Sequence, residues 1–334
     1  MASQAEPLSG LKTFQRRIEH GDLPFRYLTM FFGLLVILLV VAIGWVVWDG
    51  SAEARAEFGF GFLFQEGWNP VNNNYGAWPA IYGTLASSGI ALLIAGPLGV
   101  LIGVFLSELC PFSLRMPLSF LVELLAAIPS VIYGMWGIFV FIPFFVKYIA
   151  IPITDLVGNA TTFPLSLLSA PQTAPVTSGR GIMIAGIILA IMILPTIAAI
   201  SRDVLVVVPN HQREALLAVG ATRWEMIWKG VISYARAGIV GGMMLGLGRA
   251  LGETMAALMV IGSLKKTVES SLFAPGISAA ALVASELPNA DSSLHASTLI
   301  LIALVLFGIT LLLNAAARLL VWHVSRGPGG NVRA

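Results

Sequence analysis

The sequence predicts an all-α integral membrane protein with six transmembrane helices. Hydrophobic residues make up 57% of the 334 residues, charged residues only 11%, and the mean hydropathy is +0.88. Soluble proteins carry about a quarter charged residues, so the composition excludes that class. A membrane-spanning helix needs about 20 predominantly apolar residues, and six runs qualify: 27–48, 80–107, 118–146, 181–201, 237–262 and 296–321.

Helices are the expected form of all six runs. The runs are longer and more continuously apolar than the alternating strands of a membrane barrel, and an open sheet cannot satisfy its backbone in lipid. Prolines at positions 97, 129 and 195 predict kinked or interrupted helices. The loops 50–79, 147–180 and 263–295 share one side of the membrane, and they either meet a partner or simply link the helices.

The first run is interpreted as an uncleaved anchor that follows a tail at residues 1–26. The Ala54-Arg55-Ala56 triplet after it resembles the cleavage site of a signal peptide. However, the run at 27–48 exceeds the roughly 7–15 apolar residues of a signal sequence and begins only after the tail. The other five runs form a core at 75–321, followed by a second tail at 322–334.

Charge predicts the orientation of the chain. Of the 19 Lys and Arg residues, 13 lie in the termini and loops of one side, 5 lie on the other side, and Arg249 lies in a span. The positive-inside rule therefore places both termini in the cytoplasm. The net charge of +2 and the lack of interleaved basic and aromatic residues do not suggest nucleic-acid binding. The single Cys110 and four scattered histidines offer neither a disulfide framework nor metal-ligand spacing.

The fifth run carries two charges, Arg249 and Glu253. A charge at the centre of a membrane helix costs about 2.5–3.5 kcal/mol, so Arg249 must face protein or water. The helical period puts it on the stripe of Gly238, Gly242 and Gly246, whose G-x-x-x-G spacings favour close packing against a neighbouring helix. Glu253, one turn further on, is expected to hold Arg249 in an i,i+4 pair.

Two interpretations of this pair remain open from the residues alone. In the first, it is a structural ion pair that locks the bundle. In the second, it is an anion station on a permeation path, because the planar donor fork of Arg249 suits the oxygens of phosphate or a related oxyanion. Glu253 would then position the fork or accept a proton from the substrate.

A cytoplasmic loop at 206–235 is the second unusual segment. Its spacing predicts two short amphipathic helices over 210–232 that are broken at Gly220. This segment either lies on the bilayer surface or docks into a groove on a cytoplasmic partner. The residues expected to form its apolar face are Leu216, Leu217, Val219, Trp224, Ile227 and Trp228.

Glu214, Ala215 and Gly220 stand at the spacing of the E-A-A-x-x-x-G signature. In this respect the chain resembles the permease subunits of bacterial ATP-binding-cassette importers, in which that loop is the coupling helix that docks on the ATPase. Three positions depart from the family pattern: Leu216 replaces the second alanine, and Gly230 and Ser233 replace an isoleucine and a proline.

Three further stretches narrow the resemblance: YGAWPAIYGTL at 75–85, ELLAAIPSVIYGMWG at 123–137 and GRALGETMA at 248–256. Together they resemble the phosphate-specific permeases of the PstC type over most of residues 75–320. The resemblance implies that Arg249 and Glu253 act in phosphate translocation. Glu123 lies in a family motif too and is a further candidate, with a helix-terminus or interhelical contact as the alternative role.

The resemblance also implies the type I importer permease fold in the bacterial plasma membrane. The expected partners are a second permease of the PstA type, two ATPase subunits of the PstB type, an extracytoplasmic phosphate-binding protein of the PstS type, and membrane lipids. The chain lacks a G-x-x-x-x-G-K-[ST] motif, so ATP and Mg are expected on the ATPase and no cofactor or enzymatic activity in this chain. An ion-coupled carrier, a sulfate or molybdate importer and a non-transporting membrane scaffold or receptor remain as alternatives.

Overall fold

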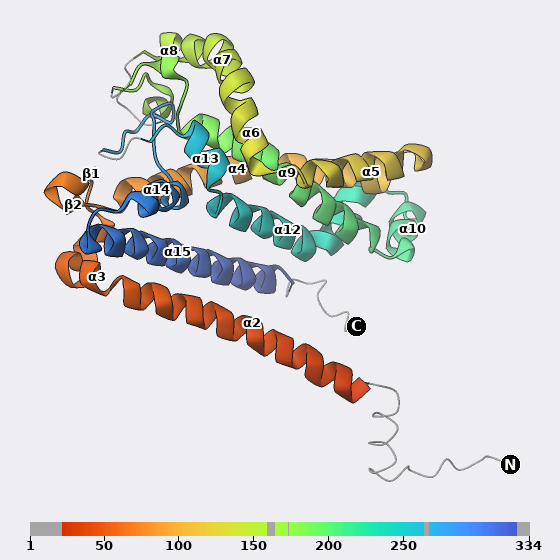
Figure 1. Cartoon of the computed structure of the whole chain (residues 1–334). Coiled ribbons are helices and arrows are strands. Elements are labelled where there is room, and N and C mark those ends of the chain that lie inside the picture. Colours follow the sequence, from red (N-terminus) through yellow and green to blue (C-terminus); the bar gives the residue numbers. More distant parts are fainter. Residues whose placement is uncertain (1–21, 159–163, 173, 264–266, 326–334) are drawn as a thin grey trace. The chain divides into compact units, whose positions relative to one another are not determined.

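A computed structural model of the chain describes residues 22–158, 164–172, 174–263 and 267–325 (Figure 1). The chain divides into two units, Met1–Gly50 and Ser51–Ala334, which are described separately. The elements are α2 Asp22–Gly50, α3 Ala52–Phe58, η1 Gly59–Leu63, β1 Trp68–Asn69, η2 Pro70–Asn72, β2 Asn74–Tyr75, α4 Trp78–Val104, η3 Phe105–Leu109, α5 Phe112–Ala126, α6 Ser130–Trp136, η4 Gly137–Phe141, α7 Ile142–Phe145, η5 Val146–Ala150, α8 Ile151–Val157, η6 Leu165–Leu168, η7 Val176–Ser178, α9 Ile182–Val206, α10 Asn210–Ala218, α11 Arg223–Glu225, η8 Met226–Ile232, α12 Ser233–Leu251, α13 Met255–Val260, α14 Ala279–Glu286, η9 Leu287–Asn289 and α15 Ser293–Ser325.

Six helical segments of the described residues are long and apolar enough to span a membrane, which confirms the predicted fold class and number of helices. Four of them lie close to the predicted runs, whereas the third and fifth differ in their bounds. The segments are Pro24–Gly50, Trp78–Leu109, Ser130–Val157, Val176–Val206, Arg223–Leu251 and Ser293–His323.

The third span begins later than predicted because the chain leaves the helix between Ala126 and Ser130. Pro129 has φ −58° and ψ 138°, an extended conformation, and it precedes the first turn of α6. Proline has no backbone N–H and disfavours a helical residue before it, so it ends the preceding helix. The interruption predicted at Pro129 is confirmed. The predicted bounds of the span, 118–146, are wrong at their start, because α5 is separate from the span. Pro97 and Pro195, in contrast, lie inside the continuous helices α4 and α9.

The fifth span begins earlier and ends earlier than predicted. The short helix α11, the π-helical η8 and α12 run without a gap from Arg223 to Leu251. Residues 252–254 are not helical, and α13 starts a new helix at Met255. The prediction of one helix over 237–262 is thus wrong at both ends, because hydropathy is insensitive to a short polar break between two apolar helices.

The first unit contains α2, an apolar helix of 29 residues. Its candidate span has a mean hydropathy of 2.9, and none of that window is buried within the structure. A helix that is apolar on all sides needs an apolar environment, which lipid or another membrane helix provides. Its length matches the thickness of a bilayer.

The core of the second unit is built around α9. Two-thirds of the α9 window (67%) is buried, more than in any other of the six candidate spans. Helices α4 and α12 pack along it (Figure 1). Small residues of α4, including Ala91 and Ala95, are buried against this layer together with Ile188 and Ile193 of α9. Close helix packing of this kind, with small residues at the contact, is typical of membrane bundles.

A second, aromatic core lies at the end of this unit opposite α10 (Figure 1). Strands β1 and β2 form a short antiparallel pair in which Trp68 faces Tyr75. The Tyr75 ring stacks on the ring of His295 at the start of α15, with a centroid distance of 5.6 Å. The indole N–H of Trp68 and the His295 ring both bond the Glu286 carboxylate of α14. These contacts tie the hairpin to the last span.

Candidate functional site

The glycine stripe of α12 lies against α9. A Cβ atom added at Gly238 would come within 2.4 Å of Val204, one at Gly242 within 2.9 Å of Ile200, and one at Gly246 within 2.8 Å of Ile197. A larger side chain at any of these positions would therefore require the neighbouring side chains or the helix α9 to shift. The same face of α12 continues to Arg249, which bonds a residue of α9.

Arg249 lies in the last turn of α12. Its Nη1 donates to the Thr196 hydroxyl of α9 at 3.2 Å, and its Nη2 donates to the Ala126 carbonyl at the end of α5 at 3.4 Å. The Tyr133 hydroxyl of α6 donates to the Leu125 carbonyl beside it at 2.9 Å. The guanidinium thus lies where α5, α6, α9 and α12 approach one another.

The expected i,i+4 pair of Arg249 and Glu253 does not form. Both residues are described, and no ion pair joins them in the structure. Because α12 ends at Leu251, Glu253 is no longer one helical turn along the same face. Its Oε1 instead accepts a hydrogen bond from the backbone N–H of Ala256 at 3.2 Å, in the first turn of α13. This placement corrects the sequence-based expectation and leaves the two charges separate.

Separation of the charges changes what Arg249 can do. Two hydrogen bonds to neutral oxygens, as described here, do not neutralise a guanidinium, and other donors of the five-donor fork are unused among the described residues. Carboxylate and phosphate oxygens are the acceptors that match this fork. The site is therefore a partly buried cation at a helix break, which is suited to a mobile anion.

Glu123 does not join this group. Its carboxylate pairs with the guanidinium of Arg202 at 2.9 Å, and Arg202 also pairs with Asp203 at 2.6 Å. The Glu123 side chain is 55% exposed, whereas that of Arg202 is 15% exposed. The contact joins α5 to α9, so the structure places Glu123 in an interhelical ion pair beside the break rather than at Arg249.

The loop between α9 and α12 contains two helical pieces separated at Gly220. Helix α10 ends at Ala218, and Gly220 has φ +87°, a left-handed conformation that favours glycine. The second piece starts at a capping box, in which the Thr222 side chain accepts from the Glu225 N–H and the Glu225 carboxylate accepts from the Thr222 N–H. Unlike the expected short helix, this second piece continues directly into the fifth span.

Both signature residues of α10, Glu214 and Ala215, are exposed. The expected apolar face of the loop is split. Leu216 and Ile227 pack inward on a cluster at the ends of α4, α9 and α12. The remaining members of the face point outward, and the two tryptophans contact each other edge to face at 5.5 Å. These outward residues are Leu217, Val219, Trp224 and Trp228.

Two departures from the family motif, Leu216 and Gly230, contact each other. A Cβ atom at Gly230 would lie 2.4 Å from the Cδ1 atom of Leu216. The large Leu216 therefore occupies the space that a larger residue at position 230 would need.

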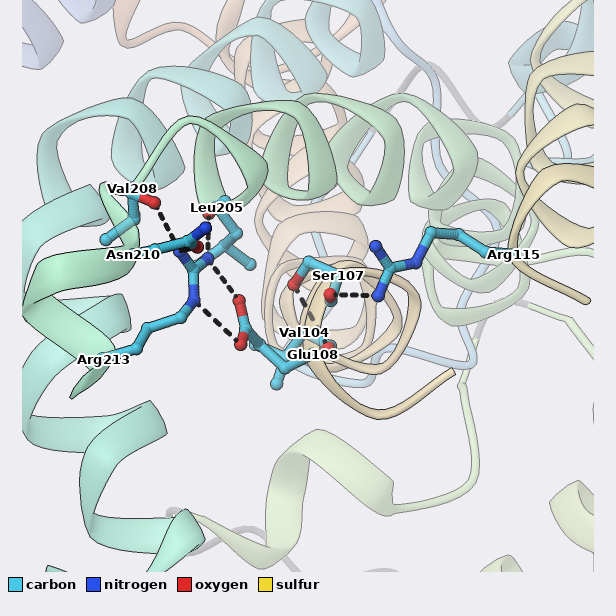
Figure 2. Close-up of polar contacts among 8 residues, drawn as sticks. All are labelled: Val104, Ser107, Glu108, Arg115, Leu205, Val208, Asn210 and Arg213. Carbon is cyan, nitrogen blue, oxygen red and sulfur yellow. Dashed lines mark hydrogen bonds and ion pairs between the residues drawn. The ribbon is translucent and has the colours of Figure 1, made fainter. Parts of the chain in front are cut away.

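Arg213 and Glu108 form a buried ion pair that sequence analysis missed (Figure 2). Arg213 Nη2 and Nε donate to the two oxygens of Glu108 at 2.7 and 3.2 Å. The remaining donors bond the carbonyls of Val208 and Leu205 and the side-chain oxygen of Asn210. The two side chains are 17% and 7% exposed. All five donors of Arg213 are thus used, and α10 is tied to η3 and to the end of α9. The partners are 105 residues apart, and only the polarity of Glu108 at the end of an apolar run hinted at the pair.

Comparison with known proteins assigns the family. The family described as "Binding-protein-dependent transport system inner membrane component" matches residues 97–326. The "Phosphate transport system permease protein PstC" of Pasteurella multocida is 44% identical over 315 residues, covering 94% of this chain and 96% of that protein. The protein of the same name from Mesorhizobium japonicum is 42% identical over 314 residues, covering 94% of each chain.

A solved structure of the MetNI methionine ABC transporter in an inward-facing conformation is 20% identical, with a TM-score of 0.48, and covers 75% of this chain and 95% of that chain. The family match and the long, highly similar relatives agree with the six described spans. The chain therefore belongs to the family of inner membrane components of binding-protein-dependent transport systems.

Proposed function

We propose that this chain is the permease subunit of an ATP-binding-cassette importer and that it translocates inorganic phosphate across the bacterial plasma membrane. The observation that carries the proposal is Arg249, a partly buried cation in a span, bonded to neutral oxygens and not paired with Glu253. An unneutralised guanidinium in an apolar bundle is costly, so its presence there favours a functional role. The names of the two long relatives support phosphate as the anion.

In this proposal Arg249 is a weak station for the anion, and Glu253 lies at the start of the next helix, beside the path. Weak contact is suitable because conduction requires release as well as entry. The exposed residues of the α10–α11 loop, with Glu214, Ala215 and Gly220, would dock on the ATPase. Gly238, Gly242 and Gly246 would hold α12 against α9 so that the station keeps its geometry.

The partners follow from the same proposal. A second permease of the PstA type would complete the channel, two PstB-type subunits would bind ATP and Mg, and a PstS-type protein would deliver phosphate from outside. No cofactor would bind this chain itself. Both termini would lie in the cytoplasm, because the basic loops are concentrated on that side.

The proposal is tested by phosphate uptake into proteoliposomes that hold the four components. We expect uptake of labelled phosphate that requires ATP inside and is not displaced by excess sulfate or molybdate. Uptake driven by an ion gradient without ATP would indicate a secondary carrier instead, and displacement by sulfate would indicate another oxyanion importer.

The docking role of the loop has a separate test. In a Cys110→Ala background, cysteines replacing the exposed Ala215 or Ala218, near Glu214 and Gly220, are expected to crosslink to the ATPase. A cysteine at Val71, which is exposed next to the β1–β2 pair at the opposite end of the unit, is the matched control. Crosslinks from neither loop position would contradict the coupling role.

A further inference from the structure

The π-helical turn η3, which ends the second span, is held from two sides. Arg213 of α10 bonds the Glu108 carboxylate, as described above. Arg115 of α5 donates from Nη2 to the Ser107 carbonyl at 2.7 Å. Figure 2 shows the two guanidinium groups approaching the turn from opposite sides. Adjacent residues of one turn thus connect the α10 segment to α5.

The other end of α5 lies at the anion site. The Ala126 carbonyl at its carboxyl end accepts the bond from Arg249, and the Leu125 carbonyl accepts the bond from Tyr133. Glu123, one turn earlier, pairs with Arg202 of α9. Helix α5 has 15 residues and is about 22 Å long, and although Pro117 lacks one backbone donor near its start, the helix is continuous from Phe112 to Ala126. A displacement at one end is therefore expected to move the other.

These contacts form one route, in which charge-assisted bonds at η3 and at Arg249 are joined by the backbone of η3 and by helix α5. It runs from Arg213 to Glu108, through Ser107 to Arg115, along α5 to Ala126, and from there to Arg249. The junction at η3 is π-helical, a geometry that it shares with η4, η5 and η8. The turn is also polar: Ser107 and Glu108 follow an apolar stretch that runs from Gly89 to Leu106.

We propose that Arg213, Glu108 and Arg115 are positioning residues that transmit movement of the ATPase-facing α10 segment through α5 to Arg249. The inference rests on the proposed importer function and adds a route within this chain. When α10 moves, the Arg213–Glu108 ion pair makes η3 move with it, and the bond between Arg115 and the Ser107 carbonyl makes α5 move with η3. The bond between Ala126 and Arg249 then changes, which alters the donors that Arg249 offers to the anion.

A purely structural role gives a different expectation, because Arg115 also caps the carboxyl end of a helix. Loss of a cap lowers stability but leaves any ATP-dependent movement of α5 unchanged. The decisive measurement is therefore movement, and spatial continuity alone does not establish coupling.

The experiment uses the complete importer in lipid nanodiscs with Cys110→Ala as the parent. Spin labels are attached at Leu124→Cys on α5 and Leu319→Cys on α15, both of which are exposed. The distance between them is measured by double electron–electron resonance without nucleotide and with ATP trapped on the ATPase. Arg115→Met removes the donors but keeps the apolar stem, Arg115→Lys keeps the charge, and Arg318→Met at an exposed arginine of α15 is the matched control.

We expect an ATP-dependent distance change in the parent and in Arg318→Met, a loss of at least about half of it in Arg115→Met, and partial recovery in Arg115→Lys. ATP hydrolysis is expected to persist in all of them. Glu108→Gln breaks the other half of the junction and is expected to reduce the change in the same way if Arg115→Met does not assemble.

The same distance change in Arg115→Met and in the control would overturn the inference. So would a parent that imports phosphate with ATP but shows no change at α5. A parent that does not import phosphate at all would contradict the proposed function instead, so the two failures are distinguishable.

Discussion

Replacement of Gly242 by alanine tests the packing that places Arg249. The added Cβ atom would lie 2.9 Å from Ile200 Cγ2 and 3.1 Å from Ile200 Cβ. Ile200 is branched at this carbon and cannot turn both atoms away, so α12 and α9 must separate by a few tenths of an ångström. Overpacking of this kind costs about 1–3 kcal/mol.

Gly241→Ala is the matched control, because a Cβ atom there has no neighbour within 4 Å. Both substitutions gain the same helix propensity, about 1 kcal/mol, so the difference between them isolates packing. At about 2 °C per kcal/mol, we expect Gly242→Ala to unfold roughly 2–6 °C below Gly241→Ala.

The assay is thermal unfolding of the purified chain in lipid–detergent micelles, followed by tryptophan fluorescence at one scan rate. Combining Gly242→Ala with Ile200→Ala makes room for the new methyl group. The unfolding midpoint of this double variant is expected to lie closer to that of Gly241→Ala/Ile200→Ala than the midpoints of the two single glycine variants lie to each other. Equal midpoints for the two single variants would refute the close contact of α12 with α9.

Three further predictions concern other contacts of the second unit. Glu108→Gln leaves Arg213 charged without its carboxylate and is expected to lower the free energy of unfolding by about 3 kcal/mol. In a double-mutant cycle followed by thermal unfolding, Glu108→Leu combined with Arg213→Met is expected to lose less stability than the sum of the two single variants. Additive losses would contradict the ion pair. Gly230→Ile is expected to destabilise the α10 loop, which would be measured as faster amide hydrogen exchange in that loop. Adding Leu216→Ala to this variant is expected to restore the slower exchange. Unchanged fast exchange in the double variant would show that the two side chains do not share space. Burial, followed by neighbouring carboxylates, raises the pKa of the Tyr75 phenol. The phenol therefore ionises at lower pH in the unfolded chain than in the folded one, so the free energy of unfolding falls as the pH rises above about 10. Tyr75→Phe is expected to make this fall shallower and to leave the stability at pH 7 unchanged. An equally steep fall in the variant would exclude this phenol as its source.

Much of the fold could be predicted from the sequence because hydropathy reports the composition of a span directly. The six spans follow from apolar runs of sufficient length. The ends of two spans did not follow, since Gly252, Glu253 and Thr254 form a break too short to lower a window average. Pro129 carried a usable signal, because proline at that position separates α5 from α6.

The candidate site was predicted only in part, for a physical reason. Placement of Gly238, Gly242, Gly246 and Arg249 on one face requires only a regular helix, which α12 is. The Arg249–Glu253 pair required the helix to continue beyond Leu251, and it does not. Contacts over long sequence separations, such as Arg213 with Glu108, depend on how helices pack and leave no local pattern in a single sequence.

The most direct test of the central claim is phosphate uptake by the complete importer with Arg249→Ala, measured beside ATP hydrolysis and assembly yield. Arg249→Lys and Glu253→Gln serve as companion variants. If Arg249 is the anion station, uptake falls by at least about tenfold, equivalent to about 1.4 kcal/mol, while the complex assembles and hydrolyses ATP. Uptake within about twofold of the unmodified importer, or a loss that matches failed assembly, would contradict the account and return Arg249 to a structural role.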